Sequence, residues 1–137
     1  MLISTRYRKA RPVGITYVNV DVGNPSNMSH SLNLDFMVDS GAVYTVAPAT
    51  VLDELGIKPI SEETFWLANG EKIVRKRGGA FFKYGDKIGI ADVVFGEEGD
   101  SNLLGATTLE SLGLALDPFK RELKPMRMII GGFRPDR

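Results

Sequence analysis

Short runs in which apolar and polar residues alternate constrain the fold of this chain more than any other feature. Residues 15–22 read ITYVNVDV and residues 32–38 read LNLDFMV, with an apolar residue at every second position over most of each run. A period of two is typical of a strand that buries one face. The intervening residues 23–31, GNPSNMSHS, are mostly turn formers, so the two runs are predicted to pair as a long-looped hairpin.

Two further hairpins are predicted later in the chain. Asn69-Gly70 lies between two apolar runs and indicates a type I′ turn, which needs positive φ at both central residues. Gly85-Asp86 predicts a second tight turn within residues 79–95. The acidic residues 96–100, GEEGD, are predicted to form a solvated turn. Five to seven strands are therefore expected.

Two short helices are predicted among the strands, over residues 48–56 and 107–113. The first has Pro48 at the first helical position, where proline is favoured. The second begins with a capping box from Thr107 to Glu110. Both end at a glycine, and both follow an apolar strand and a Gly-Ala turn. This similarity suggests an internal repeat of two related halves.

The composition sets limits on domain number and chemistry. A chain of 137 residues suits one domain, which we expect to span 1–137 with a core at about 15–130 and a basic N-terminal arm at 1–14. Basic and acidic residues number 17 each, which argues against nucleic acid or an anionic membrane as partner. The chain has no cysteine and one histidine, so a metal site of the usual Cys/His kind is not expected. No cofactor is predicted. No apolar run suggests a membrane span or signal peptide, and a cytoplasmic protein is predicted.

One carboxylate stands out from this pattern. In LDFMVDSGAVYTVAP, residues 34–48, Asp39 directly follows a strand predicted to be buried. A carboxylate beside buried strands is costly unless it is hydrogen-bonded or neutralised. The tripeptide Asp-Ser-Gly is common in an Asx turn that leaves a strand. A catalytic carboxylate held in a tight loop is the alternative interpretation.

The segments FMVDSGAVYTV and NLLGATTLESLGL, with the Asn69-Gly70 hairpin between them, resemble retropepsin-like aspartic proteases. The resemblance covers roughly residues 15–118, and its features occur in the family's order. The sequence is more similar to bacterial or archaeal cellular members than to viral ones. It implies a mainly β, single-lobe closed β-barrel subunit with two short helices that acts as a homodimer. It also implies an aspartic endopeptidase that hydrolyses extended peptides with water activated between two Asp39 carboxylates, one from each subunit.

The resemblance assigns roles to particular residues. Asp39 is the catalytic acid, Ser40 hydrogen-bonds across the dimer, and Gly41 keeps the loop tight. The expected substrate-binding residues lie in the loop, in the hairpin that forms the flap and in the later glycine segment: Ala42, Trp66, Leu67, Ala68, Asn69, Gly70 and Leu104. The expected partners are a second copy of the chain and a peptide or protein substrate, with no nucleic acid and no membrane.

The sequence departs from viral members at two positions and leaves other functions open. Val43 and Ala106 stand where those members have an acid and an arginine that form an ion pair. One alternative is a catalytically weak or inactive module of the same fold that dimerises or binds peptides. Another is an unrelated ligand-binding β-barrel, which requires the Asp39 loop to lie far from residues 103–105.

Several other residues are expected to have no catalytic role. The basic clusters at 6–11 and 75–77 are predicted to be solvated, and His30 to lie on the surface. Residues 126–133 are predicted to form a final strand at the dimer interface. The aromatic residues are expected to fill the core, with Trp66 also a candidate for substrate contact: Phe65, Trp66, Phe81, Phe82 and Phe95.

Overall fold

The computed structural model describes residues 14–127, which contain nine strands and two short helices. The helices are α1 (Ala49–Glu54) and α2 (Ala106–Leu112). The strands are β1 (Tyr17–Gly23), β2 (Ser31–Val38), β3 (Thr45–Pro48), β4 (Ser61–Trp66), β5 (Lys72–Tyr84), β6 (Lys87–Gly96), β7 (Leu103–Leu104), β8 (Leu114–Asp117) and β9 (Glu122–Pro125). The prediction of a mainly β chain with two short helices is confirmed.

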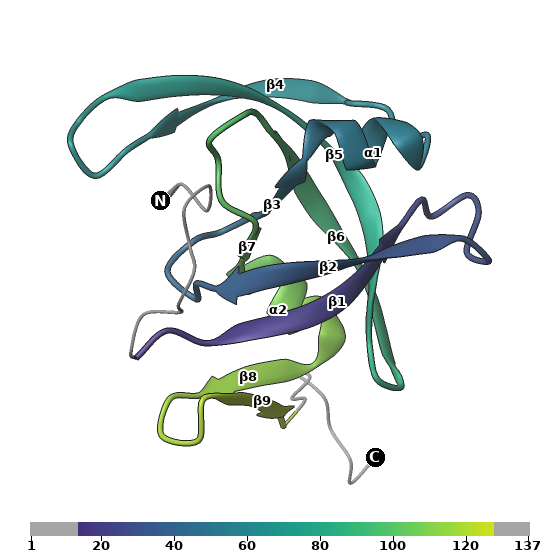
Figure 1. The fold of residues 1–137 in the computed structure, drawn as a ribbon, viewed down its shortest axis with the longest axis vertical. Helices are drawn as coiled ribbons and strands as arrows, with labels where there is room; N and C mark the ends of the chain where they lie inside the picture. Colours follow the sequence, from purple (N-terminus) through teal and green to yellow (C-terminus); the bar gives the residue numbers. More distant parts are fainter. Residues whose placement is uncertain (1–13, 128–137) are drawn as a thin grey trace, which may run out of the picture.

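Seven strands form one sheet in the order β1-β2-β7-β3-β6-β5-β4. β1 also pairs with β5, so the sheet curls back on itself. The β4–β5 hairpin arches over the top of the molecule in Figure 1, and β8 and β9 form a separate two-stranded sheet at the bottom. The predicted hairpin of β1 with β2 is confirmed, with Val20 opposite Leu34.

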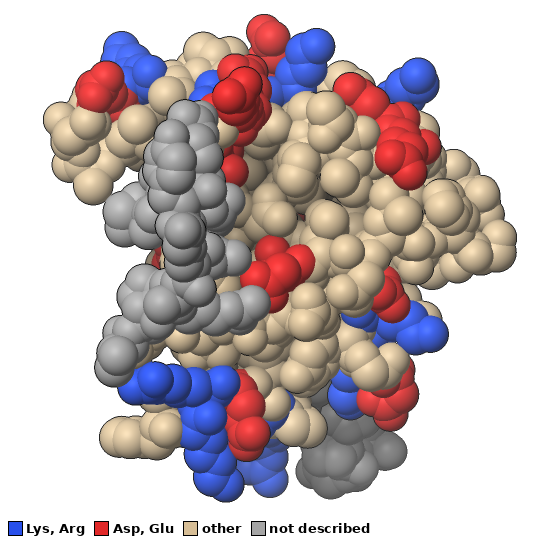
Figure 2. Space-filling view, in the orientation of Figure 1, with Lys and Arg blue, Asp and Glu red and all other residues tan. Residues whose placement is uncertain are grey.

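The core follows from the alternation in the sequence. Val18, Val20 and Val22 point inward from β1, and Phe36 joins them from β2. The helices close the core with apolar side chains such as that of Leu52. Burying one such side chain contributes about 1.5–3 kcal/mol of transfer free energy. On the face shown in Figure 2, basic and acidic side chains lie together over the β4–β5 hairpin and near β8 and β9.

Both helices begin one residue away from the predicted start. Pro48 is the N-cap of α1 and also the last residue of β3, rather than the first helical residue. The prediction of a capping box in α2 is wrong, because Gly105 is the N-cap and no side chain caps the helix. The Thr107 hydroxyl instead donates to the carbonyl oxygen of Val43 at 2.9 Å. The predicted end of α2 is confirmed, since Gly113 has a φ of 69°.

The hairpin at Asn69-Gly70 is confirmed, but its turn is wider than the predicted type I′ turn. The Leu67 amide donates to the Glu71 carbonyl at 2.8 Å, and the Gly70 amide donates to the Leu67 carbonyl at 2.9 Å. Gly70 has a φ of 88°, whereas Asn69 has no positive φ. The Asn69 side chain accepts the Glu71 amide at 2.9 Å, which stabilises this alternative. The other predicted hairpin turns at Gly85-Asp86 between β5 and β6.

Three predictions about exposure fail at particular residues. Arg75 and Arg77 are not solvated: Arg75 pairs with Asp100, and Arg77 pairs with Glu63 and Asp92. Glu97 and Glu98 of the acidic turn are exposed, as expected, but the side chain of Asp100 is only 10% exposed. The reason is that these charges face one another across separate elements. Trp66 does not fill the core, because its side chain is 66% exposed.

The other aromatic residues predicted to fill the core, and the single histidine, can be compared with the structure directly. Phe81, Phe82 and Phe95 are buried and His30 is exposed, as expected, whereas Phe65 is only half-buried. Residues 1–13 of the basic arm and 128–133 of the predicted final strand lie outside the described residues. Within residues 14–127, no helix has the length and apolar character needed to cross a membrane. That same part of the chain has no cluster of three or more His, Cys, Asp or Glu residues suited to a metal ion.

Candidate functional site

Asp39 is the first residue after β2 and is held firmly at its backbone. Its amide donates to the Leu104 carbonyl at 3.0 Å, and the preceding amide of Val38 donates to the Thr16 carbonyl at 2.8 Å. The Asp39 carboxylate accepts the Gly41 amide at 3.1 Å, and its carbonyl accepts the Ala42 amide at 3.0 Å. Asp39, a half-buried residue, therefore forms the predicted Asx turn. Such a turn also fixes the orientation of the Asp39 carboxylate.

The Asp39 loop lies directly against the segment that follows β7. The Ala106 amide donates to the Ala42 carbonyl at 2.8 Å, and the Thr107 amide donates to the Val43 carbonyl at 3.0 Å. Val43 and Ala106, where the resemblance implies a departure from viral members, are thus brought near each other. The hypothesis of an unrelated ligand-binding barrel is wrong, because it required these segments to be far apart.

A buried hydroxyl pair and a glycine hold this crossing together. The Thr45 hydroxyl accepts the Gly105 amide at 3.0 Å and lies 2.5 Å from the Thr108 hydroxyl. Both threonines are fully buried. A Cβ atom on Gly105 would lie 2.5 Å from the carbonyl carbon and oxygen of Tyr44, so the close approach requires glycine.

An apolar cavity of about 340 Å³ lies beside the Asp39 loop. The loop forms one wall, the β4–β5 hairpin another, and β3, β6 and β7 the floor. Its lining is Gly41, Ala42, Val43, Tyr44, Val46, Phe65, Trp66, Leu67, Ile73, Arg75, Val94 and Leu103. Apolar walls with few polar groups suit an apolar ligand side chain.

The cavity brings together part of the predicted site. Gly41, Ala42, Trp66 and Leu67 line it. The hairpin tip, residues 68–70, is exposed and lies outside the lining.

The remaining predicted residues lie elsewhere. Ser40 is exposed and borders a second cavity beside α2 and β8. Asp39 is two residues before the first lining residue of the apolar cavity. Leu104 is fully buried in the core and offers the loop its backbone carbonyl.

The cavity lining also includes residues that no sequence pattern placed in the site, among them Tyr44, Phe65, Ile73 and Arg75. The Tyr44 and Phe65 rings meet edge to face at 6.4 Å, which joins the loop to the hairpin. The alternation of β4 and β5 could have indicated Phe65 and Ile73, because both lie on the inner face of the hairpin. Arg75 could not be identified from sequence because its partner is distant along the chain.

Charged groups near the cavity have shifted pKa values. Hydrogen bonding to Asp100 is the main reason that the pKa of Arg75 is raised. The pKa of Glu63 is lowered, first by the Ser61 hydroxyl and then by Arg77. The Arg77 guanidinium also lies 5.6 Å from the centre of the Tyr44 ring, within the range of a cation–π contact.

Comparison with known proteins identifies one family. The model of the aspartyl protease family matches residues 18–108, more than half of the chain. No curated protein matches. The simian foamy virus protease is 19% identical, with a TM-score of 0.45 and coverage of 68% of this chain and 92% of that one. A retropepsin-like aspartic protease from Rickettsia conorii is 22% identical, with a TM-score of 0.44 and coverage of 85% and 92%.

Proposed function

Since the chain belongs to the aspartyl protease family, we propose that it is an endopeptidase that cleaves extended peptides as a homodimer. The observation that carries the proposal is the placement of Asp39. Its loop is hydrogen-bonded to the backbone of the glycine segment and leads into the wall of an apolar cavity. The closed-barrel subunit and the single domain spanning 1–137 belong to this proposal.

The chemistry explains why a dimer is needed. In carboxylate-catalysed amide hydrolysis, two carboxylates about 3 Å apart share one proton, because both cannot ionise. One then activates water, and the other donates a proton to the carbonyl oxygen. The aspartate loop of this fold occurs once in the chain, so each subunit contributes Asp39 at a two-fold axis.

The surrounding residues have roles that follow from this arrangement. Ser40 is exposed and does not line the apolar cavity, so its side chain is accessible to a partner subunit. Gly41 donates its amide to Asp39 and keeps the loop tight. Ala42, Trp66 and Leu67 contact the substrate, while residues 68–70 at the hairpin tip close over it and exclude water. Leu104 supports the loop through its backbone.

Peptide-library cleavage across pH 4–8 tests the proposal, with mass in solution measured alongside. Asp39→Asn should remain a folded dimer and lose cleavage. Asp53→Asn, the same change at an exposed carboxylate on α1, should cleave like the wild type. Cleavage by Asp39→Asn at the wild-type rate would refute the role of Asp39.

Mixing the wild type with Asp39→Asn tests whether both subunits contribute. With equal amounts and free exchange, about a quarter of all dimers contain two wild-type chains. Activity per wild-type chain should therefore fall to about half if each site needs both carboxylates. Unchanged activity in proven mixed dimers contradicts the shared site. If the wild type dimerises but cleaves nothing, the alternative of a peptide-binding or dimerising module with little or no activity replaces the protease.

A further inference from the structure

The part of the β4–β5 hairpin nearest its tip projects beyond the rest of the sheet. β5 pairs with β6 only from Arg77 onward. Residues 72–76 of β5 pair with β4, which is the last strand of the sheet order. Strand pairing with β6 therefore does not set the height of this projecting part over the cavity. Side-chain contacts between this part and the rest of the molecule then contribute to its position.

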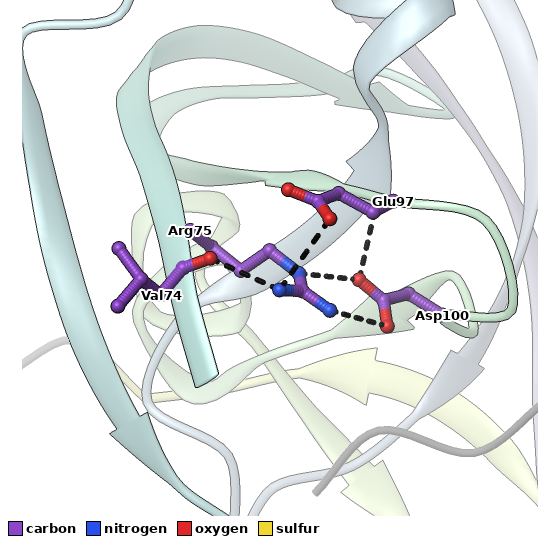
Figure 3. Close-up of polar contacts among 4 residues, drawn as sticks. All are labelled: Val74, Arg75, Glu97 and Asp100. Carbon is purple, nitrogen blue, oxygen red and sulfur yellow. Dashed lines mark hydrogen bonds and ion pairs between the residues drawn. The ribbon is translucent and has the colours of Figure 1, made fainter. Parts of the chain in front are cut away.

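Arg75 connects the projecting part to the loop between β6 and β7 (Figure 3). Its Nε donates to Oδ2 of Asp100 at 2.8 Å, and its Nη2 donates to Oδ1 at 3.2 Å. Nη1 donates to the Val74 carbonyl at 3.0 Å and lies 3.7 Å from Oε1 of Glu97. A guanidinium that binds both oxygens of one carboxylate defines distance and orientation together.

The loop holds the Asp100 carboxylate ready for this contact. The Glu97 amide donates to Oδ2 of Asp100 at 2.8 Å, and the Asp100 amide donates back to the Glu97 carbonyl at 2.9 Å. The side chains of Arg75 and Asp100 are only 14% and 10% exposed. Screening by solvent and salt is therefore weaker than for an exposed ion pair.

The position of Arg75 links this contact to the cavity. Arg75 lines the cavity two residues after Ile73, on the same face of β5. Displacing Arg75 from the loop would move Ile73 and, across the hairpin, Phe65, which is opposite it in register. The Tyr44–Phe65 ring contact and the packing of Phe65 on the buried cluster that includes Val46 would then hold that wall near the Asp39 loop.

We infer that Arg75 is a positioning residue whose ion pair with Asp100 holds the projecting hairpin at the height that a bound peptide needs. The inference rests on the proposed function, since it assumes that the cavity holds substrate. Breaking the pair lets the hairpin lift away from the cavity. Substrate binding weakens as a result, although the Asp39 loop is unchanged.

Distances between spin labels test the inference without any activity. The chain has no cysteine, so Ala68→Cys at the hairpin tip and Asp53→Cys on α1 place labels at two exposed sites. Dilution into unlabelled protein removes signals between subunits. Arg75→Gln and Asp100→Asn should each broaden the distance distribution, and the double variant should broaden it no further. Lys76→Gln, the same charge change on the exposed face of β5, should leave it unchanged.

Peptide cleavage gives the second measurement. Arg75→Gln should lower kcat/KM about tenfold, mainly through KM, as expected for loss of a charge-assisted contact. Arg75→Lys should recover only part of the loss. The ammonium keeps the positive charge, but it cannot bind both carboxylate oxygens in the way a guanidinium does. Circular dichroism verifies folding, and Asp100→Asn carries the test if Arg75→Gln does not fold.

The two measurements separate the two hypotheses. Unchanged distance distributions in Arg75→Gln and Asp100→Asn overturn the inference, whether or not the protein cleaves peptides. Broadened distributions support the role of the ion pair even if the wild type cleaves nothing, in which case only the proposed function fails. Broadened distributions with an unchanged KM show that the hairpin height does not matter for substrate, and overturn the inference as well.

Discussion

Replacing Gly105 with alanine should destabilise the crossing that supports the Asp39 loop. The new Cβ would lie 2.5 Å from the carbonyl carbon and oxygen of Tyr44 and 3.0 Å from the Thr45 amide nitrogen. Ordinary contacts begin near 3.4 Å, so the two backbones must separate by about 0.9 Å. The φ of Gly105 is −93°, which alanine adopts freely, so the cost is one of packing alone.

Overpacking of this kind costs about 1–3 kcal/mol in the free energy of unfolding. For a chain of this size, the melting temperature should fall by about 3–10 °C. Thermal and urea unfolding followed by circular dichroism, at one protein concentration, measure the change. Peptide cleavage should also fall, because the shift moves the backbone that follows Asp39.

Gly79→Ala is the matched control. A Cβ there meets no atom within 4 Å, and Gly79 has no positive φ. Alanine at this position in β5 should leave stability unchanged or raise it by up to about 1 kcal/mol. Equal unfolding curves for Gly105→Ala and Gly79→Ala would refute the close approach of the two segments.

Two further predictions concern polar groups near the site. Thr45→Val should lower the free energy of unfolding by about 1–3 kcal/mol, because it leaves the buried Gly105 amide without its acceptor. Thr108→Val should lower the free energy of unfolding by less, because the Thr45 hydroxyl still accepts the Gly105 amide. Equal urea midpoints for the two variants would contradict this difference. The pKa of Glu63 is lowered from 4.5 by Ser61 and Arg77, so its contribution to stability is present above pH 4.5 and is lost as pH falls through the lowered value. Glu63→Gln should make the urea midpoint less sensitive to pH between about 5 and 3, and an unchanged slope contradicts the role of this pair.

Local chemistry determined what could be predicted from sequence. The alternation in β1 and β2 reflects burial of one strand face, and it predicted both strands and their pairing. Gly113 ends its helix at positive φ, as a glycine there commonly does. The start of α2 was missed because Gly105 continues in extended conformation from β7, and the Thr107 hydroxyl finds a partner in another segment.

Contacts between distant segments account for the rest. Arg75 and Asp100 are separated by 25 positions, and nothing in either local sequence indicates that they meet. The exposure of Trp66 depends on the hairpin projecting beyond β6, which a strand pattern does not reveal. The Asp39 loop was identified because its chemistry is concentrated in adjacent residues, whereas the cavity walls come from four separate parts of the chain.

The Asp39 loop and the β4–β5 hairpin, which form two walls of the cavity, belong to the same chain. In a two-fold dimer, the cavities of the two subunits would therefore be identical and related by the two-fold axis, one at each end of a shared groove. A peptide has a direction, and the groove would have none. Favoured cleavage sequences should then carry similar apolar side chains on both sides of the broken bond, and palindromic compounds should make better inhibitors than directional ones of the same size.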